Sequence, residues 1–353
     1  MKRKVVLFCE ALRNRAGIER MTVELANLLC AAFEVSIVTI DAFSKEECPY
    51  AISERVEVTS LNSYFKKSVF SLNRRNIVLL RRWLKRVKPE TLVAVATPMV
   101  RIAVPAAVGL GIKVIGWEHF NIFAGSKIGA IYKAIAPWFV SKTVVLTEAD
   151  ARDYQKFLAP RIESIPNFTS IGSAAPSECE SKIALAVGRH AHQKGFDMLI
   201  KAWAKTEAEG WKLRIVGSGA EKAKNEALAR ELNVEDRIEF REATPEIVKE
   251  FQDASCFVLS SRYEGLVLVL IEAKMMGLPS VCFDCPNSPR EVVRDGIDGW
   301  LVEAENIDGL AAQLTKRLNA PDCLKRAGKM AREDALRRYS AESVAARWTK
   351  ILS

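Results

Sequence analysis

Two glutamates eight positions apart, Glu264 and Glu272, are the first residues whose types and spacing suggest chemistry. If most of the interval is helical, their α-carbons lie about 12 Å apart along the helix axis. A retaining hydrolase needs its two carboxyl groups within about 5.5 Å, so this spacing argues against a hydrolytic pair. It suits an extended ligand that has hydroxyl groups at both ends and a diphosphate between them, near the amino end of a helix.

Two cations, Arg189 and Lys194, follow a strand-like run in the sequence AVGRHAHQKGFD. A guanidinium fork and an ammonium group on one loop can clamp a diphosphate together. His190 and His192 lie between them, and a His-x-His pair can ligate zinc. No third ligand of suitable spacing is near, and the two cations would repel a divalent ion, so we expect no metal.

Two positions in the first half of the chain are weaker candidates. Gly17 lies between the first strand-like run and a helix, where the lack of a β-carbon allows a phosphate to approach the backbone. His119 follows the strand-like run KVIGWE, although a single histidine is more often structural than catalytic. The turn at Gly17 lacks the spacing GxGxxG, which argues against an NAD-dependent enzyme.

The elements that position these residues alternate between β-branched runs and amphipathic helical stretches, a pattern typical of parallel α/β units. We expect a domain over 1–170, a linker within 167–182 and a second domain over 180–339, with a final helix over 340–353 that packs back on the first domain. Ligands of doubly wound sheets bind at the carboxyl ends of the strands. The expected strands are 4–9, 34–40, 56–61, 91–96, 113–118, 142–147, 183–187, 212–216, 238–240, 256–260, 279–283 and 300–302.

Net charge and cysteine content limit the other classes of protein to which the chain could belong. The chain has 353 residues and a net charge of +9, and nine Lys or Arg face one acid between Phe65 and Glu90. From Phe65 to Lys88, aromatic side chains accompany the cations, which suits either contact with an anionic membrane or a solvated helix with its apolar stripe in the core. We expect no transmembrane helix. The cysteines lie mostly in apolar runs, and Cys282 and Cys285 lie in or beside a strand, which favours a reducing, cytoplasmic location over a redox or metal site.

The segments EGLVLVLIEAKMMGLP and FDCPNSPREVVRDGIDGWLV resemble family 4 of the retaining glycosyltransferases, whose signature is a Glu, seven residues and a second Glu. The resemblance implies the GT-B fold, in which two doubly wound Rossmann-like domains face a central cleft. It also implies that Glu264 contacts the donor hexose and that Glu272 binds the ribose hydroxyls. The phosphates would meet the backbone amides of Leu266, Val267 and Leu268.

The same resemblance implies roles for the other candidates. Arg189 and Lys194 would neutralise the leaving nucleoside diphosphate, and the turn RIVGSGAEKAK would place Gly217 beside the donor. His119 would contact the donor sugar or relay a proton. The family usually has two glycines where this chain has Ala16 and Gly17.

The sequence therefore predicts transfer of a hexosyl or N-acetylhexosaminyl group from a nucleoside diphosphate sugar, with retention and without cofactor or metal. The resemblance favours a UDP-sugar as donor and a lipid-linked oligosaccharide or polysaccharide as acceptor, at the inner face of a bacterial cytoplasmic membrane. Two alternatives remain open. The chain could epimerise or hydrolyse a nucleotide sugar, or it could be a non-catalytic binder of nucleic acid or anionic lipid.

Overall fold

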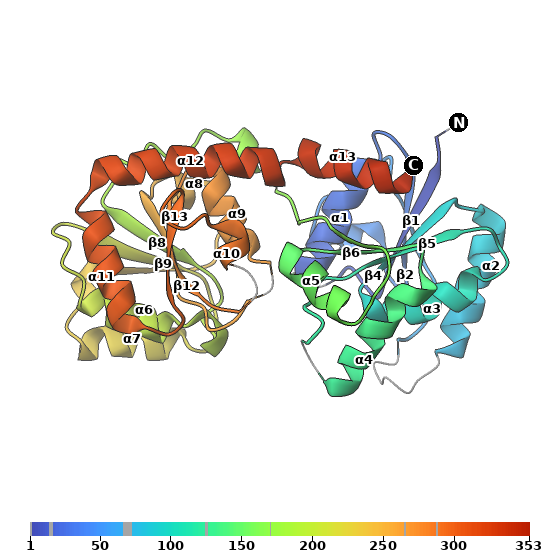
Figure 1. Ribbon diagram of the computed structural model, residues 1–353, viewed down its shortest axis with the longest axis horizontal. Coiled ribbons are helices and arrows are strands. Elements are labelled where there is room, and N and C mark those ends of the chain that lie inside the picture. The colour runs from blue at the N-terminus through green and yellow to red at the C-terminus, as the bar shows by residue number, and fades with distance from the viewer. Residues whose placement is uncertain are drawn as a thin grey trace. The chain divides into compact units, whose positions relative to one another are not determined.

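The computed structural model describes residues 2–13, 17–65, 73–123, 126–169, 171–264, 266–286 and 289–353. The chain forms two compact units (Figure 1). The first comprises Met1–Asn167 together with Val344–Ser353, and the second is Phe168–Ser343. The chain thus leaves the first unit near the start of the expected linker and returns to it at its end.

The first unit is built on a seven-stranded parallel sheet, in the order β3-β2-β1-β4-β5-β6-β7. Six of these strands coincide with expected ones to within two residues at either end, and β7 is a further edge strand. The sequence of β7, IES, is too short for an apolar alternation to reveal it. The strands are β1 Lys4–Cys9, β2 Glu34–Thr39, β3 Glu57–Ser60, β4 Thr91–Val95, β5 Lys113–Trp117, β6 Lys142–Val145 and β7 Ile162–Ser164.

The helices of the first unit bury apolar stripes against this sheet, except for α4 Lys127–Ile135, none of whose residues is buried. Leu80, Trp83 and Leu84 of α2 pack with residues of α3 and of the strands in one core cluster. Phe65 belongs to the same cluster and is 5% exposed, and Trp83 is 7% exposed. The helices are α1 Gly17–Leu29, α2 Arg74–Val87, α3 Thr97–Ala107, α4 Lys127–Ile135, α5 Glu148–Lys156 and α13 Ala341–Leu352, with a short 3-10 helix η2 Ala136–Phe139.

This burial bears on the two interpretations of the segment from Phe65 to Lys88. Phe65 and Trp83, two of the aromatic side chains of this segment, lie in the protein core. Their burial favours the solvated helix with its apolar stripe in the core, and the cations Arg82, Lys85 and Arg86 are exposed. Residues 66–72, which include the rest of the expected aromatic and basic run, lie outside the described residues.

The second unit has a six-stranded parallel sheet, in the order β10-β9-β8-β11-β12-β13. Successive residues of a strand face opposite sides, and in β11 Val258 joins one core cluster while Phe257 and Leu259 join another. Both faces of the sheet are therefore covered, as expected for a doubly wound fold. The strands are β8 Ile183–Val187, β9 Lys212–Val216, β10 Ile238–Arg241, β11 Cys256–Leu259, β12 Ser280–Asp284 and β13 Gly299–Glu303.

The last part of the chain forms two helices, which are separated at Ser340. Ser340 adopts an extended conformation and ends α12. After this break α13 packs on the first unit, where Trp348 meets Trp117 edge-on at 5.2 Å between ring centroids. The helices of the second unit are α6 Phe196–Ala204, α7 Lys222–Glu231, α8 Ile247–Gln252, α9 Leu268–Met275, α10 Pro289–Val292, α11 Ile307–Leu318 and α12 Pro321–Tyr339.

Within the described ranges, we find no helix that is both long and apolar enough to cross a membrane.

Candidate functional site

An ion pair between Lys194 and Glu264 forms the centre of the candidate site in the second unit. Lys194 Nζ lies 2.6 Å from Glu264 Oε1, and their side chains are 16% and 8% exposed. Ser261 Oγ donates to the same carboxylate oxygen at 2.6 Å, and Gln193 Nε2 donates to Oε2 at 3.3 Å. The site therefore holds a carboxylate and an ammonium group in fixed geometry where β8 and β11 end.

Glycine at position 195 allows the two loops to meet. Gly195 has a φ of +63°, and a β-carbon there would lie 2.1 Å from the carbonyl oxygen of Ser260. Ser260 Oγ in turn donates to the carbonyl of Lys194 at 2.9 Å, and the amide of Arg262 donates to the carbonyl of Gln193 at 2.9 Å. Because only glycine avoids this clash, the loop after β8 is held against the loop after β11.

A third loop, which follows β9, packs against the same region. A β-carbon at Gly217 would lie 1.8 Å from the carbonyl oxygen of Gly188, and one at Gly219 would lie 2.5 Å from that of His190. The amide of His190 donates to Ser218 O at 3.0 Å. Packing therefore requires glycine at position 217, because two backbone segments approach each other closely there.

Arg189 differs from Lys194, although both come from the loop after β8. Its side chain is exposed, and it makes no hydrogen bond or ion pair with any residue that the structure describes. The structure thus offers one cation already paired with a carboxylate and a second cation in solvent. A diphosphate could recruit Arg189 without breaking a contact among the described residues.

Glu272 lies inside α9, whereas Glu264 lies four residues before the helix begins at Leu268. The estimate of 12 Å, which assumed a largely helical interval, therefore does not apply. The apolar run after Glu264 has no alternation of polar and apolar residues, so the start of the helix could not be placed from the sequence. Glu272 is 6% exposed. Val267 is the cap residue of α9 and is buried, and the amide of Leu268 has no acceptor within the helix.

A buried ion network fixes α9 two residues beyond Glu272. Lys274 Nζ lies 3.0 Å from Asp298 Oδ2 and 2.6 Å from Asp334 Oδ2, and its side chain is 2% exposed. Arg294 pairs with Asp298 at 2.6 Å. Although burial opposes ionisation of Asp334, its hydrogen bond to Lys274 and the charges around it lower its pKa to about 2. Nothing local in the sequence indicates this network, because its members are far apart in the chain.

Cys285 is a further residue at the site that the sequence did not indicate. Burial, followed by the negative charge of Glu264, raises the pKa of its thiol to about 12. Burial also raises the pKa of Cys282 well above its usual value. Both thiols therefore stay protonated near neutral pH, where a redox pair would need a thiolate.

In the first unit, His119 follows β5 and is buried, with 8% exposure. Its ring lies 4.3 Å from that of Trp117 between centroids, and its Nε2 has no hydrogen-bond partner among the described residues. Burial lowers its pKa to about 3, so the ring is neutral at pH 7. The neighbouring carboxylate of Glu118 accepts hydrogen bonds from the His119 and Phe120 amides, at 2.9 and 3.0 Å, and does not pair with the imidazole.

Gly17 is the first residue of α1 and is exposed. A β-carbon there would meet nothing within 4 Å, so packing does not require glycine. Ala16, which replaces a glycine of the family pattern, lies outside the described residues.

The His-x-His pair is not arranged as a metal site. His190 is fully buried, and its Nδ1 lies 2.9 Å from Asn225 Nδ2. Across the described part of the chain, no three His, Cys, Asp or Glu side chains are grouped so that they could hold a metal ion.

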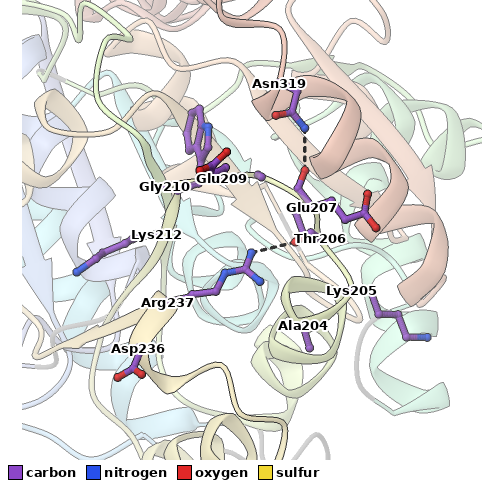
Figure 2. A pocket seen from close by; sticks show the side chains of 12 residues that line it. Ala204, Lys205, Thr206, Glu207, Glu209, Gly210, Lys212, Asp236, Arg237 and Asn319 are labelled. Carbon is purple, nitrogen blue, oxygen red and sulfur yellow. Dashed lines mark hydrogen bonds between the residues drawn. The ribbon is translucent and has the colours of Figure 1, made fainter.

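A cavity of about 900 Å³ opens at the other end of the second sheet, near Lys212 at the start of β9 (Figure 2). Two hydrogen bonds join residues of its lining: Arg237 donates to Thr206 O at 2.9 Å, and Asn319 donates to Glu207 O at 2.7 Å. Because it lies at the amino ends of the strands, it is separate from the candidate site.

Known proteins resemble the chain over nearly its whole length. The model for "Glycosyltransferase Family 4" matches residues 15–171, and that for "Glycosyl transferases group 1" matches 173–334. A Haemophilus influenzae protein described as an uncharacterized glycosyltransferase is 31% identical, over 99% of this chain and 100% of its own. The amylovoran biosynthesis glycosyltransferase AmsD of Erwinia amylovora is 26% identical, over 99% of each chain.

A Campylobacter jejuni relative, an α-1,4-N-acetyl-D-galactosaminyltransferase that acts on an undecaprenol-diphosphate-linked saccharide, is 26% identical, over 99% of this chain and 98% of its own. Among solved structures, apo lipopolysaccharide outer core galactosyltransferase WaaB matches with a TM-score of 0.81 and 20% identity, over 98% of each chain. HepE of Anabaena, in complex with UDP, matches with a TM-score of 0.82 and 16% identity, over 99% of each chain. The two parallel sheets are those of the GT-B fold, and the chain belongs to the family 4 glycosyltransferases.

Proposed function

We propose that this transferase moves a hexosyl or N-acetylhexosaminyl group from a UDP-sugar to a hydroxyl group of a lipid-linked oligosaccharide or polysaccharide, in the synthesis of bacterial surface polysaccharide or lipopolysaccharide. The observation that carries the proposal is the buried pair of Lys194 and Glu264 beside the exposed Arg189. Relatives that act on amylovoran and on an undecaprenol-linked saccharide support the acceptor class. The solved complex of HepE with UDP supports the donor base.

Arrival of the donor redistributes the charges of this site. The diphosphate takes Lys194 and Arg189 as partners, which releases one oxygen of Glu264 to accept a hydroxyl group of the sugar. Glu272 accepts the ribose hydroxyls from within α9, and the first amides of that helix, at Leu268, meet a phosphate. Gly217 allows the loop after β9 to lie close to the donor.

The transfer proceeds on one face of the sugar and retains its anomeric configuration. The bond from the anomeric carbon to the diphosphate oxygen breaks, and the acceptor oxygen bonds to the same carbon from the same side. The acceptor proton passes to the departing phosphate oxygen, whose negative charge Arg189 and Lys194 stabilise. This route needs no metal ion, because the two cations supply the positive charge. His119, neutral at pH 7, contacts the donor sugar as a hydrogen-bonding group.

An assay of UDP release tests the proposal, with UDP-glucose, UDP-galactose and the two UDP-N-acetylhexosamines, with and without an undecaprenyl-diphosphate-linked oligosaccharide. We expect release to depend on acceptor and the product to carry an α-linkage by NMR. The matched variants are Lys194→Ala, which should abolish transfer, and Lys201→Ala on the exposed surface of α6, which should not. Equal UDP release without acceptor would favour a hydrolase, and a changed sugar without release would favour an epimerase.

A non-catalytic nucleic-acid binder is the remaining alternative from the sequence. It requires exposed aromatic side chains within the basic segment for stacking on bases. Phe65 and Trp83 are buried instead, which favours the transferase.

A further inference from the structure

Arg262 is an ordered cation in the loop after β11, two residues before Glu264. Its Nη1 and Nη2 donate to Asp197 Oδ1 and Oδ2 at 2.9 and 2.7 Å, which makes a bidentate pair. The side chain of Arg262 is 14% exposed. A fork of this kind fixes the orientation of its partner as well as the distance, and it is stronger than a hydrogen bond between neutral groups.

The same guanidinium group binds a second point of the loop after β8. Arg262 Nη1 also donates to the carbonyl oxygen of His192 at 2.7 Å. His192 lies two residues before Lys194, and Asp197 lies three residues after it. Arg262 therefore holds the chain on both sides of Lys194. We call the contacts of the Arg262 guanidinium with His192 O and Asp197 the Arg262 clamp.

Other contacts hold the middle of the clamped segment. Ser260 Oγ donates to the carbonyl of Lys194, and the backbone amide of Arg262 donates to that of Gln193, both at 2.9 Å. Neither contact uses the guanidinium group, so we expect the two loops to stay joined when that group is removed. The clamp adds a fixed orientation of the short 3-10 helix His192–Lys194, from which the Lys194 side chain extends.

Gln193 links the clamped segment to the carboxylate of Glu264. Gln193 Nε2 donates to Glu264 Oε2 at 3.3 Å, and Lys194 Nζ donates to Oε1 at 2.6 Å. Because Gln193 and Lys194 are neighbours in the segment that Arg262 clamps, a shift of this segment would move both donors. The clamp thus sets the geometry of the ion pair at the centre of the candidate site.

We propose that Arg262 is a positioning residue for sugar transfer, which acts through Asp197 and the His192 carbonyl to hold Lys194 against the leaving diphosphate. This inference rests on the proposed function, because that proposal assigns the leaving group to Lys194. Stabilisation of a developing charge depends on preorganised geometry, and a displacement of about 1 Å can cost about a hundredfold in rate. A loosely held ammonium group still attracts a diphosphate. The clamp therefore matters more for turnover than for binding.

Initial rates with the UDP-sugar and acceptor that the wild type uses test this proposal. Arg262→Ala should lower kcat about 10- to 100-fold, whereas KM for the UDP-sugar should change less than about threefold. Arg262→Lys should recover only part of the loss, because a flexible ammonium group lacks the planar fork that Asp197 fits. The matched control is Glu305→Ala. It removes an exposed carboxylate 3.8 Å from Nε of the same arginine, and kcat should not change.

A double variant tests whether Arg262 acts through Asp197. Asp197→Ala should lower kcat less than Arg262→Ala does, since the bond to His192 O remains. Arg262→Ala/Asp197→Ala should have the kcat of Arg262→Ala within about twofold, because both substitutions break the same clamp. If the two losses multiplied instead, the residues would act independently and the proposal would be wrong.

Hydrogen exchange of the protein without donor or acceptor measures the clamp separately from transfer. The amides of Lys194 and Gly195 donate to Ala191 O and His192 O. In Arg262→Ala they should exchange on the order of tenfold faster than in the wild type. Exchange in the buried strand β8 should be unchanged, which shows that the variant stays folded.

Wild-type kcat in Arg262→Ala would overturn the proposal, and so would a loss confined to KM. A loss of kcat together with faster exchange in β8 would also overturn it, because Arg262 would then serve stability alone. A wild type that transfers no sugar, in which Arg262→Ala still speeds exchange at Lys194, would contradict the proposed function while confirming that the clamp orders this loop.

Discussion

The two units differ in how they hold the residues that the sequence marked as chemical. In the second unit, Lys194 and Glu264 are charged groups in a hydrogen-bonded network drawn from two loops. In the first unit, His119 is buried and neutral, and Gly17 faces open space. The unit that carries the family signature therefore holds charged candidate groups in a hydrogen-bonded network, whereas the two candidates of the other unit are uncharged at pH 7.

The second unit also has buried ion pairs that hold the helix of its candidate site in place. Helix α9, which carries Glu272, is anchored through Lys274 to two buried aspartates. An electrostatic site works best when its charges need no rearrangement during the reaction. Such rigidity suits the stabilisation of a leaving diphosphate that we propose for this unit.

Lys274→Ala should have the largest effect, because it leaves Asp298 and Asp334 buried without their ammonium partner. We expect a loss of about 3–5 kcal/mol in the free energy of unfolding of the second unit. Lys325→Ala breaks an exposed pair with Glu180 and should cost little stability, because solvent screens both charges. Urea titration followed by tryptophan fluorescence measures both. A loss for Lys274→Ala as small as that for Lys325→Ala would mean that the network does not anchor α9.

Lys194→Ala should have the next largest effect, on catalysis. Removal of one group that stabilises the leaving charge is expected to lower kcat on the order of 10²- to 10³-fold. His119→Gln should lower it less, because a neutral donor or acceptor is retained at that position. Initial rates at saturating UDP-sugar measure both variants. A larger loss for His119→Gln would reverse the contrast between the two units.

The fold, and the two glutamates and two cations as candidate residues, could be predicted from the sequence. The pairing of Lys194 with Glu264 could not. The β-branched runs fell on buried strands such as β1 and β8, because parallel strands covered on both faces are continuously apolar. Lys194 and Glu264 are 70 residues apart, and nothing local indicates that Gly195 brings their loops together.

Two further differences have a physical reason. The helix that contains Glu272 begins at Leu268, inside the uniformly apolar run LVLVLI of residues 266–271, so no periodicity in the sequence marks that start. In the segment from Phe65 to Lys88, cations and aromatic side chains lie close in sequence, which by itself suits contact with an anionic membrane. Burial, which depends on the sheet, separates Phe65 and Trp83 from those cations.

Low pH should lower the stability of the first unit, because unfolding lets His119 take up a proton. Its pKa is about 3 in the folded protein and near 6.5 when unfolded. Between those values the unfolded chain binds a proton that the folded chain does not, so stability falls as the pH falls below 6.5. From pH 7 to 4.5 the loss is roughly 2–3 kcal/mol. His119→Leu should show a shallower decline in urea titrations over this range, and an identical decline would contradict the buried neutral ring.

Gly17→Ala should have the smallest effect on stability, within about 1 kcal/mol and in the stabilising direction, because alanine favours a helix and open space surrounds the site. Gly217→Ala is the matched change in the second unit and should destabilise it, since its β-carbon would overlap the carbonyl of Gly188. Thermal unfolding measures both. Equal effects would contradict the close backbone approach after β9.

The central claim is that the second unit binds a nucleoside diphosphate through Lys194 and Glu272. Isothermal titration with UDP, GDP and ADP, on the wild type and on Lys194→Ala, Glu272→Ala and Lys201→Ala, tests it most directly. We predict that UDP binds, that the first two variants lose this binding and that Lys201→Ala retains it. A folded wild type that binds none of the three, or variants that bind UDP as well as the wild type does, would contradict the claim.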